Sequence, residues 1–505
     1  MTARRPAMWL IVTWTLLSSA AGLGAQTVDS PTRLLVNATV VDGTGSPGFT
    51  GEVLVRDGLI AAVGDPGSIP RPAGAEVIDL SGLVLTPGFV DIHNHSTGGI
   101  FRDPLAATQV SQGITTIVVG ADGGSPWPIG DFLDRIDATR PAVDVATLVG
   151  HGTVRRAALG DDFRRTATDL EIADMTERVA VAMSEGAYGL SSGLEYDPGF
   201  YSSTGELVAL AREAAAHGGF YMSHMRDEEE GLLDAVAEAI RIGREAGLPV
   251  QISHIKAGNA SVWGKAAEVL GMIAAANAAG LDVTADQYPY TAWQSGLAIV
   301  VRSRQFQNPD SVAAGIDAIG GGERLQVVGY DPEPTLNGLR LSEIATRKGL
   351  SEVDTYMLLM RNGGSRVIGH TMNDDDVDEF MRSRWVMTSS DGGIGSPHPR
   401  GAGTFPRVLG HYVRERGLIG LEQAVRRATS MPARRMSLND RGVIRVGARA
   451  DLVAFDAATV ADRSTFSDPG LTAVGIDRVW VAGELVWAEG AVTGARPGKA
   501  VRALP

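Results

Sequence analysis

The sequence predicts an α/β fold: a TIM (β/α)8 barrel with a composite β-sandwich domain formed by the N- and C-terminal segments. Apolar, strand-like runs alternate with Ala-rich helical stretches through the middle of the chain, and eight such runs can be counted. Short alternating runs with glycine at the turns occur at both ends of the chain, which predicts antiparallel strands there.

The first 25 residues have the order of a secretory signal peptide. Two arginines at 4–5 precede an apolar run at 8–17, and small residues follow up to Ala25. The apolar run is shorter than the roughly 20 residues that span a bilayer. We therefore expect a cleaved signal at 1–25, export to the periplasm or the medium, and no stable membrane insertion after cleavage.

The remaining chain divides into three expected segments. Residues 26–87 and 441–505 carry the alternating pattern and are expected to form the N- and C-terminal parts of the β-sandwich. Residues 88–440 carry the barrel. The stretch at about 294–366 is too long for one strand-to-helix connection, so we expect an inserted subdomain there.

Composition excludes several classes of protein. The 505 residues are 44% hydrophobic, which is enough for a large core, and the formal net charge is −14. Because nucleic-acid binding needs a clustered basic surface, we expect no nucleic-acid partner. The chain has no cysteine, so any metal site must use His, Asp, Glu or Lys.

The stretch "FVDIHNH" places His93 and His95 at the end of the first barrel strand. Side chains alternate along a strand, so both imidazoles project to the same side and can hold one ion. An isolated pair of this kind is as often a hydrogen-bonded structural pair, and the rest of the chain must decide.

Four more residues with metal-binding side chains follow predicted strands. Asp122 ends strand two, His224 strand five, His254 strand six and Asp391 strand eight. Active sites of such barrels lie at the carboxyl ends of the strands. Five of the eight strands thus deliver a candidate ligand to one face, which predicts a metal site.

Several longer stretches resemble the amidohydrolase superfamily, and more closely its N-acyl-D-amino-acid deacylase (D-aminoacylase) family. They are "LTPGFVDIHNH", "GLSSGLEYDPGFYSSTGEL", "YMSHMRDE", "PVQISHIKA", "DVTADQYPYTA", "VMTSSDGG", "HPRGAGTFPRVLG" and "ADLVAFD", which together cover nearly the whole chain after the signal. The resemblance implies zinc-dependent hydrolysis of the amide bond in a small N-acyl-D-amino acid, with metal-activated water as nucleophile.

The resemblance also implies a ligand set for one or two Zn²⁺ ions per chain. His93, His95 and Asp391 would form one side of the centre, and His224 and His254 would bind the more tightly held zinc. Asp391 would be the general base. Imidazole and carboxylate are suitable ligands for Zn²⁺.

Strand two departs from the family pattern. Where the family commonly reads Gly-Asn-Cys-Gly, this chain reads Gly120-Ala121-Asp122-Gly123. Asp122 keeps the negative charge of a thiolate and could ligate or bridge metal, although it is a harder ligand. Since "AYGLSSGL" offers no bridging lysine, Asp122 is the best candidate bridge; the alternative is that it only caps the following loop.

Four residues are candidates for substrate binding through the same resemblance: Lys256, Tyr196, Tyr288 and Arg400. In the family the matching Lys, Tyr and Arg hold the substrate carboxylate, and a guanidinium suits a carboxylate geometrically. A structural role for each is nearly as plausible.

The other histidines at strand ends or on helices do not complete the ligand set. We interpret His151 as a structural or supporting residue, and His217 and His411 as lying on helix surfaces. His370 also follows a strand-like run without joining the set.

Three competing hypotheses remain. A metal-dependent aminohydrolase (deaminase) needs an acid three residues after the strand-five histidine, and Asp227 occupies that position. An isoaspartyl- or D-dipeptidase-like peptidase would use the same site. A non-enzymatic exported binding protein on a barrel scaffold would predict a broken ligand set.

Overall fold

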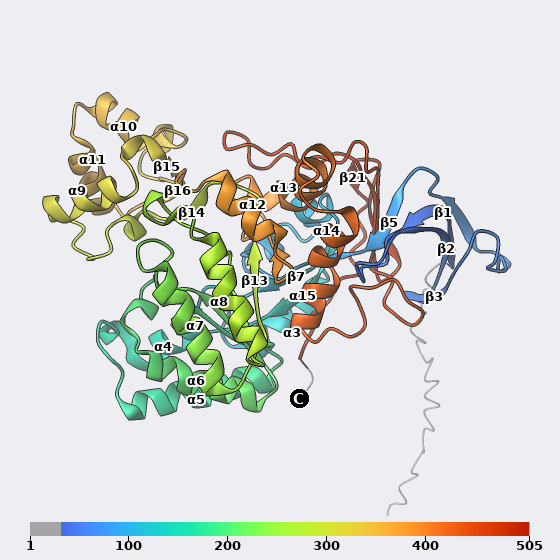
Figure 1. Ribbon diagram of the computed structural model, residues 1–505, viewed down its shortest axis with the longest axis horizontal. Coiled ribbons are helices and arrows are strands. Elements are labelled where there is room, and N and C mark those ends of the chain that lie inside the picture. The colour runs from blue at the N-terminus through green and yellow to red at the C-terminus, as the bar shows by residue number, and fades with distance from the viewer. Residues whose placement is uncertain (1–31, 504–505) are drawn as a thin grey trace, which may run out of the picture.

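The computed structural model describes residues 32–503, which form a barrel, a β-sandwich and an insertion (Figure 1). The signal peptide expected at 1–25 lies outside the described residues. Within 32–503, no helix has both the length and the apolar character needed to cross a membrane.

Eight parallel strands form the barrel, and the third is divided into two pieces. They are β6 (Phe89–Asp91), β7 (Ile114–Val119), β8 (Asp144–Thr147) with β9 (Val149–Gly150), β10 (Gly189–Gly193), β11 (Phe220–His224), β12 (Val250–Ile252), β13 (Val283–Gln287) and β17 (Val386–Thr388). A parallel bridge between Asn94 and Gly392 joins the first strand to the last. Leu148 N donates to Val119 O where β8 continues into β9. The barrel is therefore closed, and the predicted fold class is confirmed.

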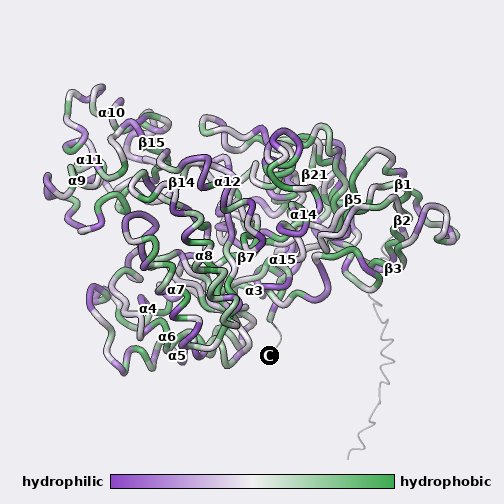
Figure 2. Tube along the Cα trace, viewed as in Figure 1, coloured by the Kyte–Doolittle hydropathy of each residue, from purple (hydrophilic) through white to green (hydrophobic). Residues whose placement is uncertain are grey.

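Helices follow the strands and cover the outside of the barrel (Figure 1). The main ones are α3 (Ile129–Thr139), α4 (His151–Leu159), α5 (Asp169–Ser184), α6 (Thr204–Ala216), α7 (Leu232–Ala246), α8 (Ala266–Ala278), α12 (Asp374–Arg382) and α14 (Leu421–Ala428). Figure 2 shows hydrophobic residues alternating with hydrophilic ones along these helices, as expected when one face packs on the strands.

Local sequence explains where these helices begin and end. Thr168 Oγ1 accepts from Glu171 N while the Glu171 side chain accepts from Thr168 N, a capping box that starts α5. Gly247 follows α7 with a φ of 76°, the left-handed position that glycine occupies most readily. The barrel helices thus have residue-level start and stop signals.

Both ends of the described chain contribute to the β-sandwich. The N-terminal part supplies β1 (Arg33–Val40), β2 (Phe49–Arg56), β3 (Leu59–Gly64), β4 (Glu76–Asp79) and β5 (Val84–Pro87), and the C-terminal part β18 (Leu452–Phe455), β19 (Ile476–Val481), β20 (Glu484–Ala488) and β21 (Ala491–Val492). The two parts join where β5 pairs antiparallel with β18, so that Leu85 lies opposite Ala454. These two residues, Leu35 and Trp480 belong to one buried apolar cluster. The sandwich is composite, as predicted.

Between β13 and β17 the chain leaves the barrel and forms an insertion with its own sheet. Its three antiparallel strands have the order β14 (Trp293–Gly296), β16 (Arg366–Gly369) and β15 (Leu325–Val328), and it carries α9 (Pro309–Ala318), α10 (Leu341–Lys348) and α11 (Glu352–Arg361). Gln294 and Arg366 line a cavity together with residues of the barrel strand ends. The insertion therefore forms one wall of the barrel mouth.

Candidate metal centre and cavity

The six candidate ligands lie at the carboxyl ends of the barrel strands. Asp122, His254 and Asp391 have positive φ values of 54°, 33° and 44°. This conformation is uncommon for residues other than glycine, and such residues cluster at functional sites. Each lies just after a strand, at β7, β12 and β17 respectively. The chain therefore adopts uncommon backbone conformations where these side chains meet.

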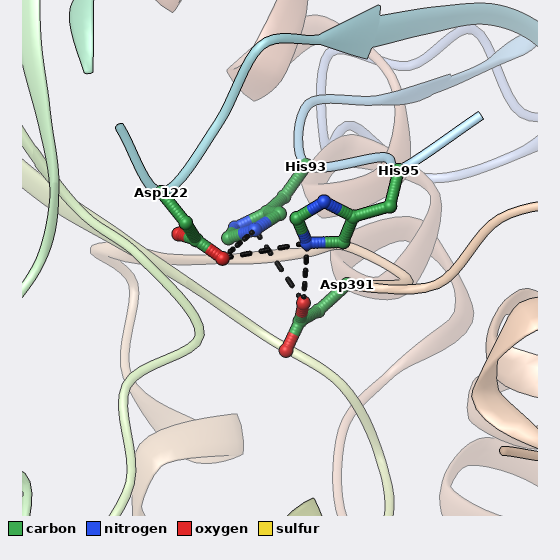
Figure 3. Close-up of side chains that lie close together, drawn as sticks. All are labelled: His93, His95, Asp122 and Asp391. Carbon is green, nitrogen blue, oxygen red and sulfur yellow. Dashed lines mark hydrogen bonds and ion pairs between the residues drawn. The ribbon is translucent and has the colours of Figure 1, made fainter. Parts of the chain in front are cut away.

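The first group of donors comprises His93, His95, Asp122 and Asp391 (Figure 3). Asp122 Oδ2 lies 3.2 Å from His93 Nε2 and 3.3 Å from His95 Nε2. Asp391 Oδ1 lies 3.0 Å from His95 Nε2 and 3.5 Å from His93 Nε2. A tetrahedral zinc site with bonds near 2.1 Å has ligand atoms about 3.4 Å apart. The spacing of the four donors therefore suits one ion.

The second group comprises Asp122, His224 and His254. His224 Nδ1 lies 2.8 Å from His254 Nε2, and His254 Nε2 lies 3.5 Å from Asp122 Oδ1. Asp122 Oδ1 is buried and has no hydrogen-bond partner among the residues that the structure describes. Asp122 thus turns one oxygen to each group, the position that a bridging carboxylate needs.

Three of the four histidines have a carboxylate at the nitrogen that faces away from the centre. His93 Nδ1 lies 3.3 Å from Asp286 Oδ1. His224 Nε2 lies 3.0 Å from Glu195 Oε2, and His254 Nδ1 lies 3.1 Å from Glu228 Oε1. Such carboxylates fix the tautomer and the ring orientation of metal-binding histidines. The donor set and its supports therefore fit one or two divalent cations such as Zn²⁺.

Sequence reasoning missed these three supporting carboxylates. Asp286 lies within β13, Glu195 directly follows the "GLSSGL" strand, and Glu228 lies in "HMRDEEE". The period-two pattern places Asp286 among inward-facing residues, which was an available signal. Glu195 and Glu228 lie in loops, where no periodicity applies.

The electrostatics of the centre favour positive charge. Burial raises the pKa of the Asp391 carboxyl, but Arg400, His254 and His93 outweigh burial and hold that pKa well below its ordinary value. Burial also opposes ionisation of Asp122, and His93 and His254 again outweigh it, so that its pKa is lowered. Burial lowers the pKa of His254, whereas the surrounding carboxylates raise it to about 9. A bound cation would supply the positive charge that these carboxylates attract.

The centre opens into a cavity of about 470 Å³. All four residues predicted to bind substrate line it, namely Tyr196, Lys256, Tyr288 and Arg400. Lys256 Nζ is 2.6 Å from Glu228 Oε2. The Arg400 guanidinium lies over the ring of Tyr288 at 4.6 Å, and its buried Nε has no hydrogen-bond partner among the described residues. The structure therefore brings the predicted substrate residues together beside the candidate ligands.

The remaining histidines lie outside this cavity. His151 is fully buried and its Nε2 lies 2.7 Å from Glu206 Oε1, a structural pair. His217 and His411 each contact a glutamate one turn away on their own helix. His370 packs against Phe466.

His398, which sequence reasoning did not single out, holds Arg400 in place. Its Nδ1 accepts from Arg400 N at 3.0 Å and its Nε2 donates to Ala292 O at 2.9 Å. The ring thereby ties the turn before Arg400 to the start of the insertion.

Comparisons with known proteins agree with this geometry. Residues 76–487 match the sequence profile of the Amidohydrolase family. A D-aminoacylase from Alcaligenes xylosoxydans xylosoxydans is 39% identical over 491 residues, which cover 92% of this chain and 96% of that protein.

Two solved structures are similar over nearly their whole length. One is the N-acyl-D-glutamate deacylase of Bordetella bronchiseptica, complexed with zinc and a phosphonate inhibitor that mimics the tetrahedral intermediate of the reaction. It has a TM-score of 0.85 at 35% identity and covers 94% of this chain and 100% of its own. The other is a D-aminoacylase studied for the role of its binuclear metal centre, with a TM-score of 0.83 at 37% identity, over 94% of this chain and 99% of its own.

Proposed function

Because the chain belongs to the amidohydrolase family and, within it, to the N-acyl-D-amino-acid deacylase (D-aminoacylase) family, we propose that it hydrolyses the amide bond of N-acyl-D-amino acids with one or two Zn²⁺ ions. The observation that carries the proposal is the position of Asp122. Its two oxygens face two groups of donors beside a cavity that also holds an arginine and a lysine.

The described residues divide into two overlapping sets that would hold the metal. His93, His95, Asp122 and Asp391 form one set, and Asp122, His224 and His254 form the other. When bound, zinc supplies a Lewis acid that polarises a carbonyl oxygen and eases the deprotonation of water.

Asp391 is the proposed general base. Its carboxyl is buried, and its low pKa keeps it ionised, so it can accept a proton from the attacking water. The same carboxyl then donates that proton to the nitrogen of the leaving amino acid. Arg400 Nη1, which lies 2.6 Å from Asp391 Oδ2, holds the carboxylate in position during both transfers.

The cations and phenols of the cavity are proposed to orient the substrate. The unpartnered Nε of Arg400 and the ammonium of Lys256 are donors for the α-carboxylate. Burial raises the pKa of Tyr196 and of Tyr288 well above the ordinary value, so both hydroxyls keep their protons and donate hydrogen bonds. The cavity therefore offers donors to a substrate rich in oxygen acceptors.

The structure does not place Asp227, the acid that the deaminase hypothesis needs, in the cavity. Asp227 Oδ1 lies 2.9 Å from Arg302 Nη1, and Asp227 is not among the residues that line the cavity. The dipeptidase hypothesis uses the same centre and differs only in substrate.

The test is a substrate panel with purified, zinc-loaded protein. We expect free amino acid to be released from N-acetyl-D-amino acids and much more slowly from the N-acetyl-L forms. Faster cleavage of β-aspartyl dipeptides would favour the peptidase, and ammonia release from nucleobases would favour the deaminase. If no compound in the panel is turned over, the proposal is wrong.

Export is a separate proposal, supported by the order of charges and apolar residues at 1–25. N-terminal sequencing of protein recovered from the cell exterior or periplasm should begin near residue 26. Recovery of the uncut chain from the cytosol would contradict it.

A further inference from the structure

Among the described residues, two cations in the cavity wall, Arg102 and Arg366, have no carboxylate partner, and Arg366 is the one that the insertion supplies. Lys256 Nζ lies 2.6 Å from Glu228 Oε2, and Arg400 Nη1 lies 2.6 Å from Asp391 Oδ2. Arg366 also lines the cavity, but no carboxylate oxygen within residues 32–503 lies within 4.0 Å of its guanidinium. Its charge is therefore available to a ligand.

Arg366 is positioned by the insertion and not by the barrel. It is the first residue of β16, where it pairs with Gly296 of β14 on one side and Val328 of β15 on the other. The strand that carries it is therefore held from both edges. A residue placed in this way has a defined position relative to the barrel centre.

Gln294 lies between Arg366 and Arg400. With its amide oriented so that the oxygen faces Arg366, this oxygen accepts from Arg366 Nε at 3.0 Å. Arg400 Nη2 donates to the backbone oxygen of Gln294 at 3.4 Å. The two guanidinium groups thus belong to the same wall, and of the two only Arg400 has a carboxylate partner among the described residues.

The surroundings of Arg366 favour an incoming anion. Arg366 is exposed at the edge of the cavity, and the partial burial of its guanidinium and the nearby positive charge of Arg400 both lower its pKa. The ionised guanidinium is therefore less stable here than in water, and an anion would relieve both effects. A neutral side chain of the substrate would leave them unrelieved.

We propose that Arg366 binds a carboxylate on the side chain of the substrate, so that the preferred substrates are N-acyl derivatives of acidic amino acids. The inference rests on the proposed function for the reaction itself. The α-carboxylate and the scissile amide share one carbon and lie near Arg400 and Asp391. A side chain that leaves that carbon toward the insertion meets Arg366.

The sharpest comparison is between N-acetyl-D-glutamate and N-acetyl-D-glutamine, which differ in one charge and hardly in shape. Wild-type protein should show a kcat/KM roughly ten- to hundredfold higher for the glutamate compound, the range of a charge-assisted hydrogen bond. Arg366→Met should lose this preference while changing kcat/KM for N-acetyl-D-glutamine less than about threefold. Arg366→Lys should retain part of the preference.

Arg361→Gln is the matched control, because Arg361 is an exposed arginine of α11 outside the cavity wall. It changes the net charge of the insertion by the same amount and should leave the preference unchanged. N-acetyl-D-aspartate, one methylene shorter, tells which acidic side chain reaches Arg366. A wild-type enzyme that prefers N-acetyl-D-glutamine or N-acetyl-D-leucine would overturn the inference while leaving the deacylase function intact.

A binding measurement separates the two proposals. Calorimetric titration of zinc-loaded wild-type protein with D-glutamate and with D-glutamine needs no turnover. Tighter binding of D-glutamate that disappears in Arg366→Met supports the inference even if the substrate panel fails. Equal affinities of both compounds, or a preference that survives in Arg366→Met, would overturn it.

Discussion

Arg400 Nη1 lies 2.6 Å from Asp391 Oδ2, and both side chains are almost completely buried. The two residues are nine positions apart, one after strand β17 and the other at the start of α13 (Arg400–Arg407). The resemblance gave them separate roles, as general base and as substrate anchor. The structure couples these proposed roles, because Arg400 lies against Asp391 and lowers the pKa of its carboxyl.

Substitution of Arg400 should therefore affect both binding and catalysis. Arg400→Ala should lower kcat/KM for free-acid substrates. The fall should correspond to a loss of about 2 to 4 kcal/mol in transition-state stabilisation, the range for a shielded charge pair. Substrates with an amidated α-carboxyl should lose less, although kcat should fall for them too because Asp391 loses its partner. Steady-state kinetics on acid and amide pairs checks this. Equal losses would mean that Arg400 acts only through Asp391.

Asp391→Asn should separate chemistry from metal binding. We expect kcat to fall by about two to four powers of ten, because the proton acceptor is lost, with at least one zinc retained per chain by the second group of donors. Turnover and metal analysis on the same sample provide the measurement. Asp375→Asn, an exposed change on α12, is the control. Near-normal turnover by Asp391→Asn would refute its role as base.

Asp122 should be required by both groups of donors. Asp122→Ala should lower zinc content markedly and remove activity, because each group loses an anionic oxygen. Asp122→Cys, which restores the family's usual thiolate, should retain metal and some turnover. Asp122→Ser tests the alternative role, since serine also caps loops. Full zinc occupancy and a wild-type rate in Asp122→Ser would show that Asp122 only caps the loop.

The candidate ligands could be located from the sequence because their signals are local. The spacing of His93 and His95 and the ends of apolar strands are readable without distant contacts. The supporting carboxylate Glu228 and the ring of His398 are different, since they depend on how loops fold back over the barrel. Neither the periodicity of apolar residues nor a short sequence motif specifies how such a loop folds.

The insertion shows the same limit. Its length was readable from the sequence, whereas the pairing of β16 between β14 and β15 was not, because these strands are short and separated by helices. That pairing places Arg366 in the cavity wall. Arg366, the residue proposed to determine substrate choice, could therefore not be identified from the sequence alone.

Stability should depend on pH through Glu229. Burial and the nearby Glu195 raise the pKa of Glu229 to about 8, against about 4.3 in an unfolded chain. The folded chain holds this proton more tightly, so the stabilising contribution is complete below about pH 4 and is lost as the pH rises toward 8.

Glu229→Gln has no such proton to lose. The melting temperature of Glu229→Gln minus that of wild type should therefore increase as the pH is raised from about 5 to about 8. Glu230→Gln, a change at the exposed neighbouring residue, should show no trend. A constant difference between Glu229→Gln and wild type across this range would contradict the assigned pKa.

The histidines and carboxylates at the ends of the barrel strands are proposed to form a metal centre that drives amide hydrolysis. The most direct test of this proposal is the rate of amino-acid release from N-acetyl-D-amino acids by protein stripped with a chelator and then titrated with zinc. The stripped protein should be inactive, and activity should return in proportion to zinc bound, up to one or two ions per chain. Stripped protein that hydrolyses its substrate at the rate of the zinc-loaded protein would show that the reaction does not depend on the metal.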